Sequence, residues 1–384
     1  MLADSKRIIG LDVLRAIAVL AVVISHTIEY LYPLGIYSWL QPVINFLSKS
    51  THLLGLFGVE LFFGLSGYLI GGILIKTYNE SNKFTFKDVT NFWKRRWYRT
   101  LPNYWLVLSI NILLYFFLKI SDFEYYQIFF YFFGQNFCSA HPPYFFGEAW
   151  SLSVEEWFYL LLPLLFLLIP SGASVTSKAQ KVFGIIFSYI LVFTFIRYVN
   201  AQQPLFGTDQ DFGIRKVVVL RLDALIYGVL WSAIRIYNDT LFQKIKNKAF
   251  VFAIFTIPIL YYVIVNHELS NRQDNPIRMY SDAFIYTIIP LVFSCLLPYA
   301  ANVKKIIIPK MQQPIIAISK LSYSIYLVHY SLLYIPFFYN RPMETVCSRI
   351  LLYGLYWIIL LVLSYILYKN VEKPFMRLRD KKTQ

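Results

Sequence analysis

The sequence predicts an all-α, polytopic transmembrane helix bundle of about ten spans. Hydrophobic residues make up 58% of the 384 residues and charged residues only 15%, whereas a soluble domain usually carries about 25% charged residues. Mean hydropathy is +0.53. The apolar residues gather in long stretches, each able to cross ~30 Å of hydrocarbon at a rise of roughly 1.5 Å per residue. This composition and pattern place the chain in a bilayer.

The expected spans cover residues 9–31, 53–75, 101–119, 150–169, 181–199, 216–235, 249–266, 281–299, 316–338 and 350–369. Segment 124–137 is apolar but short, so we expect an interfacial or re-entrant piece there. Without an internal repeat or a loop long enough for a soluble domain, residues 1–384 are expected to form one membrane domain with a basic tail at about 369–384. The first span is too long for a cleavable signal peptide, so we expect it to be retained.

Basic residues define the expected orientation. The net charge of +15 suggests nucleic acid at first, but Lys and Arg fall in short loops between apolar stretches, so no nucleic-acid partner is expected. They are far more frequent in one alternating set of loops, which includes 76–100, 235–248 and the tail after 368. By the positive-inside rule, this set and both termini are predicted to be cytoplasmic.

The first expected span carries Asp12, Arg15 and His26 within an apolar stretch. Arg15 and His26 lie eleven residues apart, which is three helical turns plus ~20°, so both side chains point the same way about 16 Å apart. Asp12 lies one turn before Arg15 and can pair with it. The alternative is that Arg15 snorkels to the near surface while His26 lies in the opposite headgroup layer. The spacing leaves both interpretations open.

Arg96 and Arg99 lie three residues apart on an expected interfacial helix and therefore share a face. Two guanidinium groups on one face suit the oxygens of a phosphate. The residues alone favour a simpler role, which is anchoring to anionic lipid headgroups.

Ser66 lies within a glycine-rich stretch of the second span. Small residues there favour close helix packing, and the alternative is close approach of a ligand to bare backbone. Glu155 and Glu156 begin the fourth span and point about 100° apart, so one of them can face the bundle. A favourable interaction with the helix dipole is the alternative role.

In the later spans, Arg221 and Asp223 are expected to make structural pairs, with each other or with other helices. Tyr323, Tyr326 and His329 step by threes along one side of the ninth expected span, where a hydrogen-bonded packing role is favoured for His329. The histidines show no metal-binding spacing, so no metal is expected. A bridge between Cys138 and Cys347 is possible, although three cysteines exclude a disulfide scaffold.

Several stretches together resemble the acyltransferase-3 family of integral membrane acyltransferases. In chain order they are LDVLRAIAVLAVVISH at 11–26, FFGLSGYLI at 62–70, RRWYRTLPNYW at 95–105, WSLSVEEWFY at 150–159, RLDALIYG at 221–228, SYSIYLVH at 322–329 and VEKPF at 371–375. Each is weak alone, but seven in the family's order over nearly the whole chain are specific. Gly64 stands where a branched residue is more usual. The chain resembles the stand-alone form, because it has no room for the esterase-like domain of larger members.

The resemblance implies an O-acetyltransferase-like enzyme in the bacterial inner membrane. Its donor would be a cytoplasmic acyl-CoA, in particular acetyl-CoA, and its acceptor a hydroxyl of a surface glycan or lipid-linked sugar, such as O-antigen or exopolysaccharide. By position, Arg15 and His26 match the essential pair, and Arg96 with Arg99 matches the motif linked to the donor.

As a mechanism, the arginine pair would hold phosphate while the pantetheine arm passes Arg15. His26 would act as base or as transient acyl carrier, with the matching acidic residue, Glu155, orienting its ring. Ser66, Tyr326 and His329 are expected along the donor path.

Two other classes compete with this one. A transporter or flippase would share the polytopic shape and the charges within the membrane, although transporters often have two related halves and no repeat is found here. A non-catalytic assembly partner in envelope synthesis would tolerate neutral residues at Arg15 and His26. The sequence does not indicate the acceptor, the acyl group or the oligomeric state.

Overall fold

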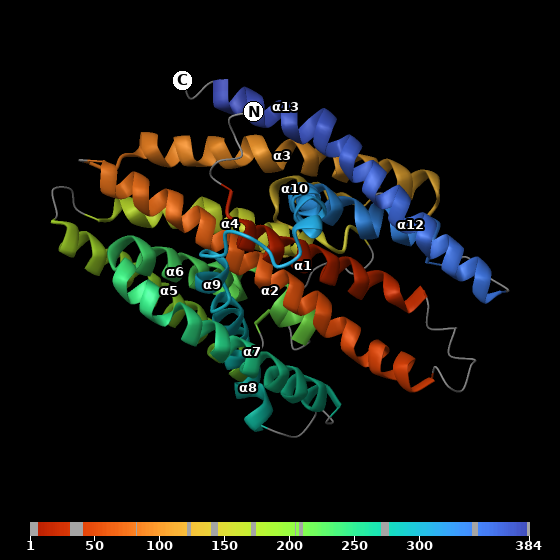
Figure 1. Ribbon diagram of the computed structural model, residues 1–384, viewed down its shortest axis with the longest axis horizontal. Helices are drawn as coiled ribbons and strands as arrows, with labels where there is room; N and C mark the ends of the chain where they lie inside the picture. The colour runs from red at the N-terminus through yellow and green to blue at the C-terminus, as the bar shows by residue number, and fades with distance from the viewer. Residues whose placement is uncertain are drawn as a thin grey trace.

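A computed structural model describes residues 7–30, 41–81, 83–120, 124–139, 145–169, 174–203, 205–206, 210–269, 276–339 and 345–381. These residues form helices joined by turns, and no strand occurs among them, so the predicted all-α class is confirmed. Figure 1 shows the helices packed into one bundle, with α1 and α2 running side by side through it.

The α-helices are α1 (Ile9–Thr27), α2 (Gln41–Glu80), α3 (Phe86–Phe117), α4 (Ala149–Leu167), α5 (Val175–Gln202), α6 (Ile226–Tyr237), α7 (Asp239–Leu269), α8 (Pro276–Ser294), α9 (Leu297–Ala300), α10 (Gln312–Val328), α11 (Ile335–Phe337), α12 (Val346–Leu367) and α13 (Lys373–Lys381). Short 3₁₀ or π turns are η2 (Tyr125–Phe132), η3 (Gln210–Arg215), η4 (Val218–Leu220), η5 (Leu222–Leu225), η6 (Pro309–Met311), η7 (His329–Tyr334) and η8 (Tyr368–Glu372).

Within the described residues, eight helices are long and apolar enough to cross a membrane, so the chain is a multi-pass membrane protein. Two of the ten expected spans are not among these eight because each is interrupted. Segment 216–235 begins with the turns η4 and η5 before α6, and segment 316–338 divides between the 17-residue α10 and the π turn η7. The count of ten and the cytoplasmic termini therefore remain predictions.

Segment 124–137 contains the 3₁₀ helix η2, which is not among the eight candidate spans. The turn ends at Phe133, whose φ of 57° is left-handed. Two tryptophans hold it, because Trp105 of α3 donates to the Tyr131 carbonyl at 3.2 Å and Trp157 of α4 donates to the Phe133 carbonyl at 2.9 Å. Two backbone carbonyls of this segment thus accept hydrogen bonds from side chains of the neighbouring helices α3 and α4.

Glycines allow α2 to pack tightly on both sides. A Cβ atom built on Gly58 would lie 2.7 Å from the Ala18 carbonyl oxygen of α1, and one on Gly67 would lie 1.8 Å from the Leu225 carbonyl oxygen. Close packing was the role favoured for this glycine-rich stretch, and these contacts support it.

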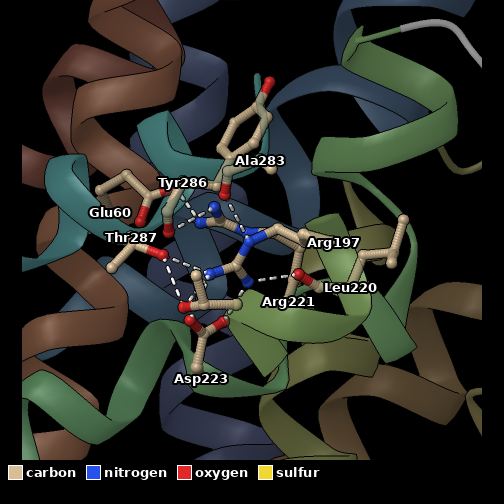
Figure 2. Close-up of polar contacts among 9 residues, drawn as sticks. Glu60, Arg197, Leu220, Arg221, Asp223, Ala283, Tyr286 and Thr287 are labelled. Carbon is tan, nitrogen blue, oxygen red and sulfur yellow. Dashed lines mark hydrogen bonds and ion pairs between the residues drawn. The ribbon is translucent and has the colours of Figure 1, made fainter. Parts of the chain in front are cut away.

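Four buried charged side chains join α2, α5 and η5 (Figure 2). Arg197 forms a bidentate ion pair with Asp223, in which it donates two hydrogen bonds of 2.6 and 2.7 Å, and Arg221 pairs with Glu60. Arg197 also donates to the Ala283 carbonyl of α8 at 3.0 Å. Arg221 and Asp223 therefore pair with other helices and not with each other.

Gly67→Ala should lower the free energy of unfolding by about 1–3 kcal/mol, because its methyl group would overlap the Leu225 carbonyl and force α2 away from η5. The matched control is Gly184→Ala in α5, where the added Cβ would meet no atom within 4 Å. The midpoint of thermal unfolding is measured for both variants in detergent, with size-exclusion chromatography after heating. Equal midpoints for the two would contradict the packing account.

Asp223→Ala should destabilise the protein by about 3–5 kcal/mol, because it leaves the Arg197 guanidinium buried without its carboxylate. The double variant Arg197→Met with Asp223→Leu should recover most of this loss, since no charge then remains. Asp380→Ala removes the exposed partner of Arg379 and should leave the midpoint unchanged. The same thermal assay compares the midpoints of the three variants. A double variant as unstable as Asp223→Ala would rule out the unpaired Arg197 charge as the cause of the lost stability.

Candidate functional site

A cavity of about 280 Å³ lies between α1, α2, α3, α4 and α10. Its walls combine apolar side chains of α2, such as Phe62 and Ile70, with polar groups. Six of the predicted site residues line it: Arg15, Ser66, Arg96, Arg99, Glu155 and Tyr326. Residues from five of the sequence stretches that resemble the family, far apart in the chain, therefore meet at one place.

A second cavity of about 320 Å³ adjoins the first, because Arg15, Leu69 and Arg99 line both. Arg7 and Lys320 also line it. Four cationic side chains and the two carboxylates of Asp12 and Glu372 thus line this second cavity, which leaves an excess of positive charge. We call it the basic mouth, and its guanidinium and ammonium groups are of the kind that bind phosphate.

Asp12 lies in the wall of the basic mouth and is bound chiefly by Arg7, through two contacts of 2.8 Å. Arg15 lies farther from this carboxylate, at 3.6 Å, and donates to Ser319 at 3.4 Å. The expected Asp12–Arg15 pair is therefore present but loose. Because Arg15 also lines both cavities, its charge faces the space that a bound anion would occupy.

Hydrogen bonds connect Arg96 to Ser66 across the central cavity wall. Arg96 stacks on the Tyr159 ring at 4.3 Å and donates to its hydroxyl at 3.0 Å. Tyr159 donates to one oxygen of Glu155 at 2.9 Å, and Ser66 donates to the other at 3.1 Å. Arg96 is thus held in the wall, whereas Arg99 also reaches the basic mouth. Sequence reasoning missed the role of Tyr159, which lies one turn after Glu155.

The ring of His26 contacts His329. His26 Nδ1 lies 2.8 Å from His329 Nε2, and the two rings are nearly parallel, with centroids 5.1 Å apart. His329 Nδ1 lies 2.6 Å from the Tyr326 carbonyl oxygen. The expectation that Glu155 orients His26 is therefore corrected, because His329 contacts Nδ1 and both Glu155 oxygens accept hydrogen bonds elsewhere. Both ring nitrogens of His329 therefore face protein atoms, and this residue lines neither cavity.

Arg15 and His26 face the same neighbour, as the helical spacing predicts. Arg15 contacts Ser319 of α10, and His26 contacts His329, the first residue of η7, which continues α10. Both side chains therefore point into the bundle rather than diverging to opposite membrane surfaces. Tyr326 connects the pair to the central cavity, because it lines that cavity while its carbonyl contacts His329.

Glu148 is a buried acid beside η7 that sequence reasoning did not single out. It precedes α4, is 1% exposed and accepts from the hydroxyl and the N–H of Ser331 at 2.7 and 3.2 Å. Burial raises the pKa of its carboxyl to about 7. A buried carboxyl group thus lies next to the turn that carries His329. In the sequence, only its position just before the Trp150–Tyr159 stretch indicates that Glu148 could belong to the site.

In the part of the chain that the structure describes, no group of three His, Cys, Asp or Glu side chains is placed to hold a metal ion. Cys138, Cys295 and Cys347 are all free thiols, so the possible bridge between Cys138 and Cys347 is not formed.

Comparisons with known proteins agree with the resemblance. SACOL0978 of Staphylococcus aureus strain COL, which carries a provisional O-acetyltransferase name, is 26% identical over 96% of this chain. O-acetyltransferase OatA of S. aureus strain NCTC 8325 / PS 47 is 24% identical over 96% of this chain. This chain covers 57% of the length of each relative. No solved structure matches it closely enough to be counted as similar.

A family model described as an acyltransferase domain matches residues 8–369, which include both cavities almost entirely, the His26–His329 pair and the buried ion pairs. The chain therefore belongs to this family of membrane acyltransferases.

Proposed function

We propose that this protein is a membrane O-acetyltransferase. It moves an acyl group, most simply acetyl, from cytoplasmic acyl-CoA to a hydroxyl of a surface glycan or lipid-linked sugar, such as O-antigen or exopolysaccharide, in a bacterial inner membrane. One observation carries the proposal: a basic mouth adjoins a central cavity lined by Tyr326, whose carbonyl contacts one member of a pair of histidines.

The donor fits the two cavities in order. The phosphates of coenzyme A bind Arg7, Arg99 and Lys320 in the basic mouth, where charge-assisted hydrogen bonds are strong. The pantetheine arm, which is long, flexible and only weakly polar, lies along the apolar wall of α2 in the central cavity. Arg15, on the wall that both cavities share, contacts the donor between these two parts.

His26 performs the chemistry. As a base, it takes the proton of the acceptor hydroxyl while the oxygen attacks the thioester carbon. The carbon–sulfur bond then breaks, and the imidazolium returns the proton to the thiolate, which leaves as coenzyme A. As an acyl carrier, its nitrogen first displaces the thiolate, and the acceptor oxygen then displaces the imidazole while the hydroxyl proton passes through the freed imidazole to the thiolate. Both routes produce an ester and a thiol.

Arg15 and Glu155 support the reaction from a distance. Arg15 lies about 16 Å from His26 along the helix, so it acts on the donor and not on the reacting atoms. Glu155 bonds to Ser66 and Tyr159, and Tyr159 in turn holds Arg96. Its role is therefore to fix the polar wall along which the donor lies.

His26→Ala should reduce acyl transfer by at least about 100-fold, because no neighbouring group replaces its proton transfer or nucleophilic role. The assay supplies radiolabelled acetyl-CoA to membranes that contain the cell's own glycans and measures label in the glycan fraction. Thermal unfolding of the purified variant should show a cooperative transition with a modestly lower midpoint, since the buried His329 Nε2 loses its hydrogen-bond partner. Full activity of the variant would exclude His26 from the reaction. Glycan that crosses the membrane without gaining label would instead identify a transporter.

Arg99→Ala should raise the KM for acetyl-CoA about tenfold with little change in kcat, since a charge-assisted hydrogen bond contributes about 1.5–3 kcal/mol and 1.4 kcal/mol is tenfold. Arg95→Ala on the same helix is the matched control, because Arg95 is exposed and lines neither cavity. Initial rates at varied acetyl-CoA concentration measure both variants. An unchanged KM in Arg99→Ala would indicate that this arginine anchors lipid headgroups instead.

A further inference from the structure

The contacts of His329 restrict where the protons of the histidine pair can lie. A backbone carbonyl oxygen only accepts hydrogen bonds, so the 2.6 Å contact to Tyr326 requires a proton on His329 Nδ1. In a neutral imidazole the other nitrogen is then an acceptor. His329 Nε2, 2.8 Å from His26 Nδ1, must therefore accept a hydrogen bond from His26.

The opposite direction would require His329 to carry protons on both nitrogens and hence a positive charge. The ring is 0% exposed, and its two nitrogens face a carbonyl oxygen and another imidazole, neither of which is negatively charged. Burying a charge without a counter-charge costs far more than burying a neutral imidazole. The neutral arrangement, with a proton on Nδ1 of both rings, is therefore favoured.

We infer that His329 is a positioning residue that sets the tautomer of His26. It holds the His26 proton on Nδ1, so the lone pair of the neutral ring lies on Nε2. Within the acetyl transfer proposed above, on which this role depends, Nε2 is then the atom that takes the hydroxyl proton or attacks the thioester carbon.

Neighbouring groups keep the pair in this geometry. The ring of Tyr330 lies 4.7 Å from the His26 ring, and the ring of Tyr326 lies 5.5 Å from the His329 ring. Tyr356 of α12 donates to the carbonyl of His329 at 2.9 Å, which fixes the first residue of the π turn η7. π turns inside helices often occur at functional sites because they change the direction of one side chain.

The pair can also stabilise the charge that the reaction produces. When His26 Nε2 takes a proton, the Nδ1 proton stays on His26, because a proton on His329 Nε2 would place the positive charge on the fully buried ring. The bond from His26 Nδ1–H to the neutral His329 Nε2 then stabilises the imidazolium. Delivery of the proton from His26 Nε2 to the thiolate restores the neutral pair, so no proton is gained or lost over the cycle.

The test compares His329→Gln with His329→Met. The two side chains have similar length, but only the glutamine amide places an acceptor oxygen near the position of His329 Nε2. We expect kcat to fall at least about 100-fold in His329→Met and to stay within about tenfold of wild type in His329→Gln. The KM for acetyl-CoA should be unchanged in both, because His329 lines neither cavity. Equal kcat in the two variants would overturn the inference.

A second measurement does not depend on either variant folding or on any activity. The chain has five histidines, so ¹⁵N-histidine labelling of the wild-type protein in lipid gives few signals, and solid-state NMR distinguishes protonated from bare ring nitrogens. The signals are assigned by their loss in His26→Ala and in a second variant in which one other histidine is replaced. Both His26 and His329 should carry their proton on Nδ1. A proton on Nε2 of His26 would overturn the inference even if the acetyl transfer itself were confirmed.

Discussion

Hydrocarbon offers no hydrogen bonds, so every charged group that the bundle buries must find its partner within the protein. This constraint explains the interruption at Arg221 and Asp223, where the chain forms short turns instead of one continuous helix. Each of these residues pairs with a residue of another helix, Glu60 or Arg197. The paired charges thereby specify which helices are neighbours, because each would be costly in any other arrangement.

The arginines around the cavities differ from those of this buried network. Arg197 and Arg221 are completely buried and are each paired at short range with one carboxylate, whereas Arg15 is partly exposed and only loosely paired with Asp12. Arg15 therefore keeps more of its charge available to an anion in the cavities than Arg197 or Arg221 does, because its pairing is loose and water can reach it.

Local periodicity predicted part of this site, and contacts between distant segments determine the rest. The common face of Arg15 and His26 follows from helix geometry alone, and the glycines of α2 indicated close packing. The contact between His26 and His329 joins residues 303 positions apart, so no local pattern reveals it. Hydropathy likewise does not detect the π turn at His329, because the turn is a change in the backbone hydrogen-bond pattern, which hydropathy does not describe. Glu155 was therefore assigned to His26 in place of the more distant partner.

Helix α2 links the buried charges to the site. It carries Glu60 of the ion-pair network and, two turns later, Ser66 of the central cavity wall. Gly58, just before Glu60, brings its backbone against α1, which bears Arg15 and His26. Gly67, just after Ser66, brings it against η5, which bears Asp223. A shift of α2 would therefore disturb the ion pairs and the cavity together. The position of the catalytic candidate His26 depends on this packing because Gly58 contacts α1 at Ala18 and Val22, one to two turns before that histidine.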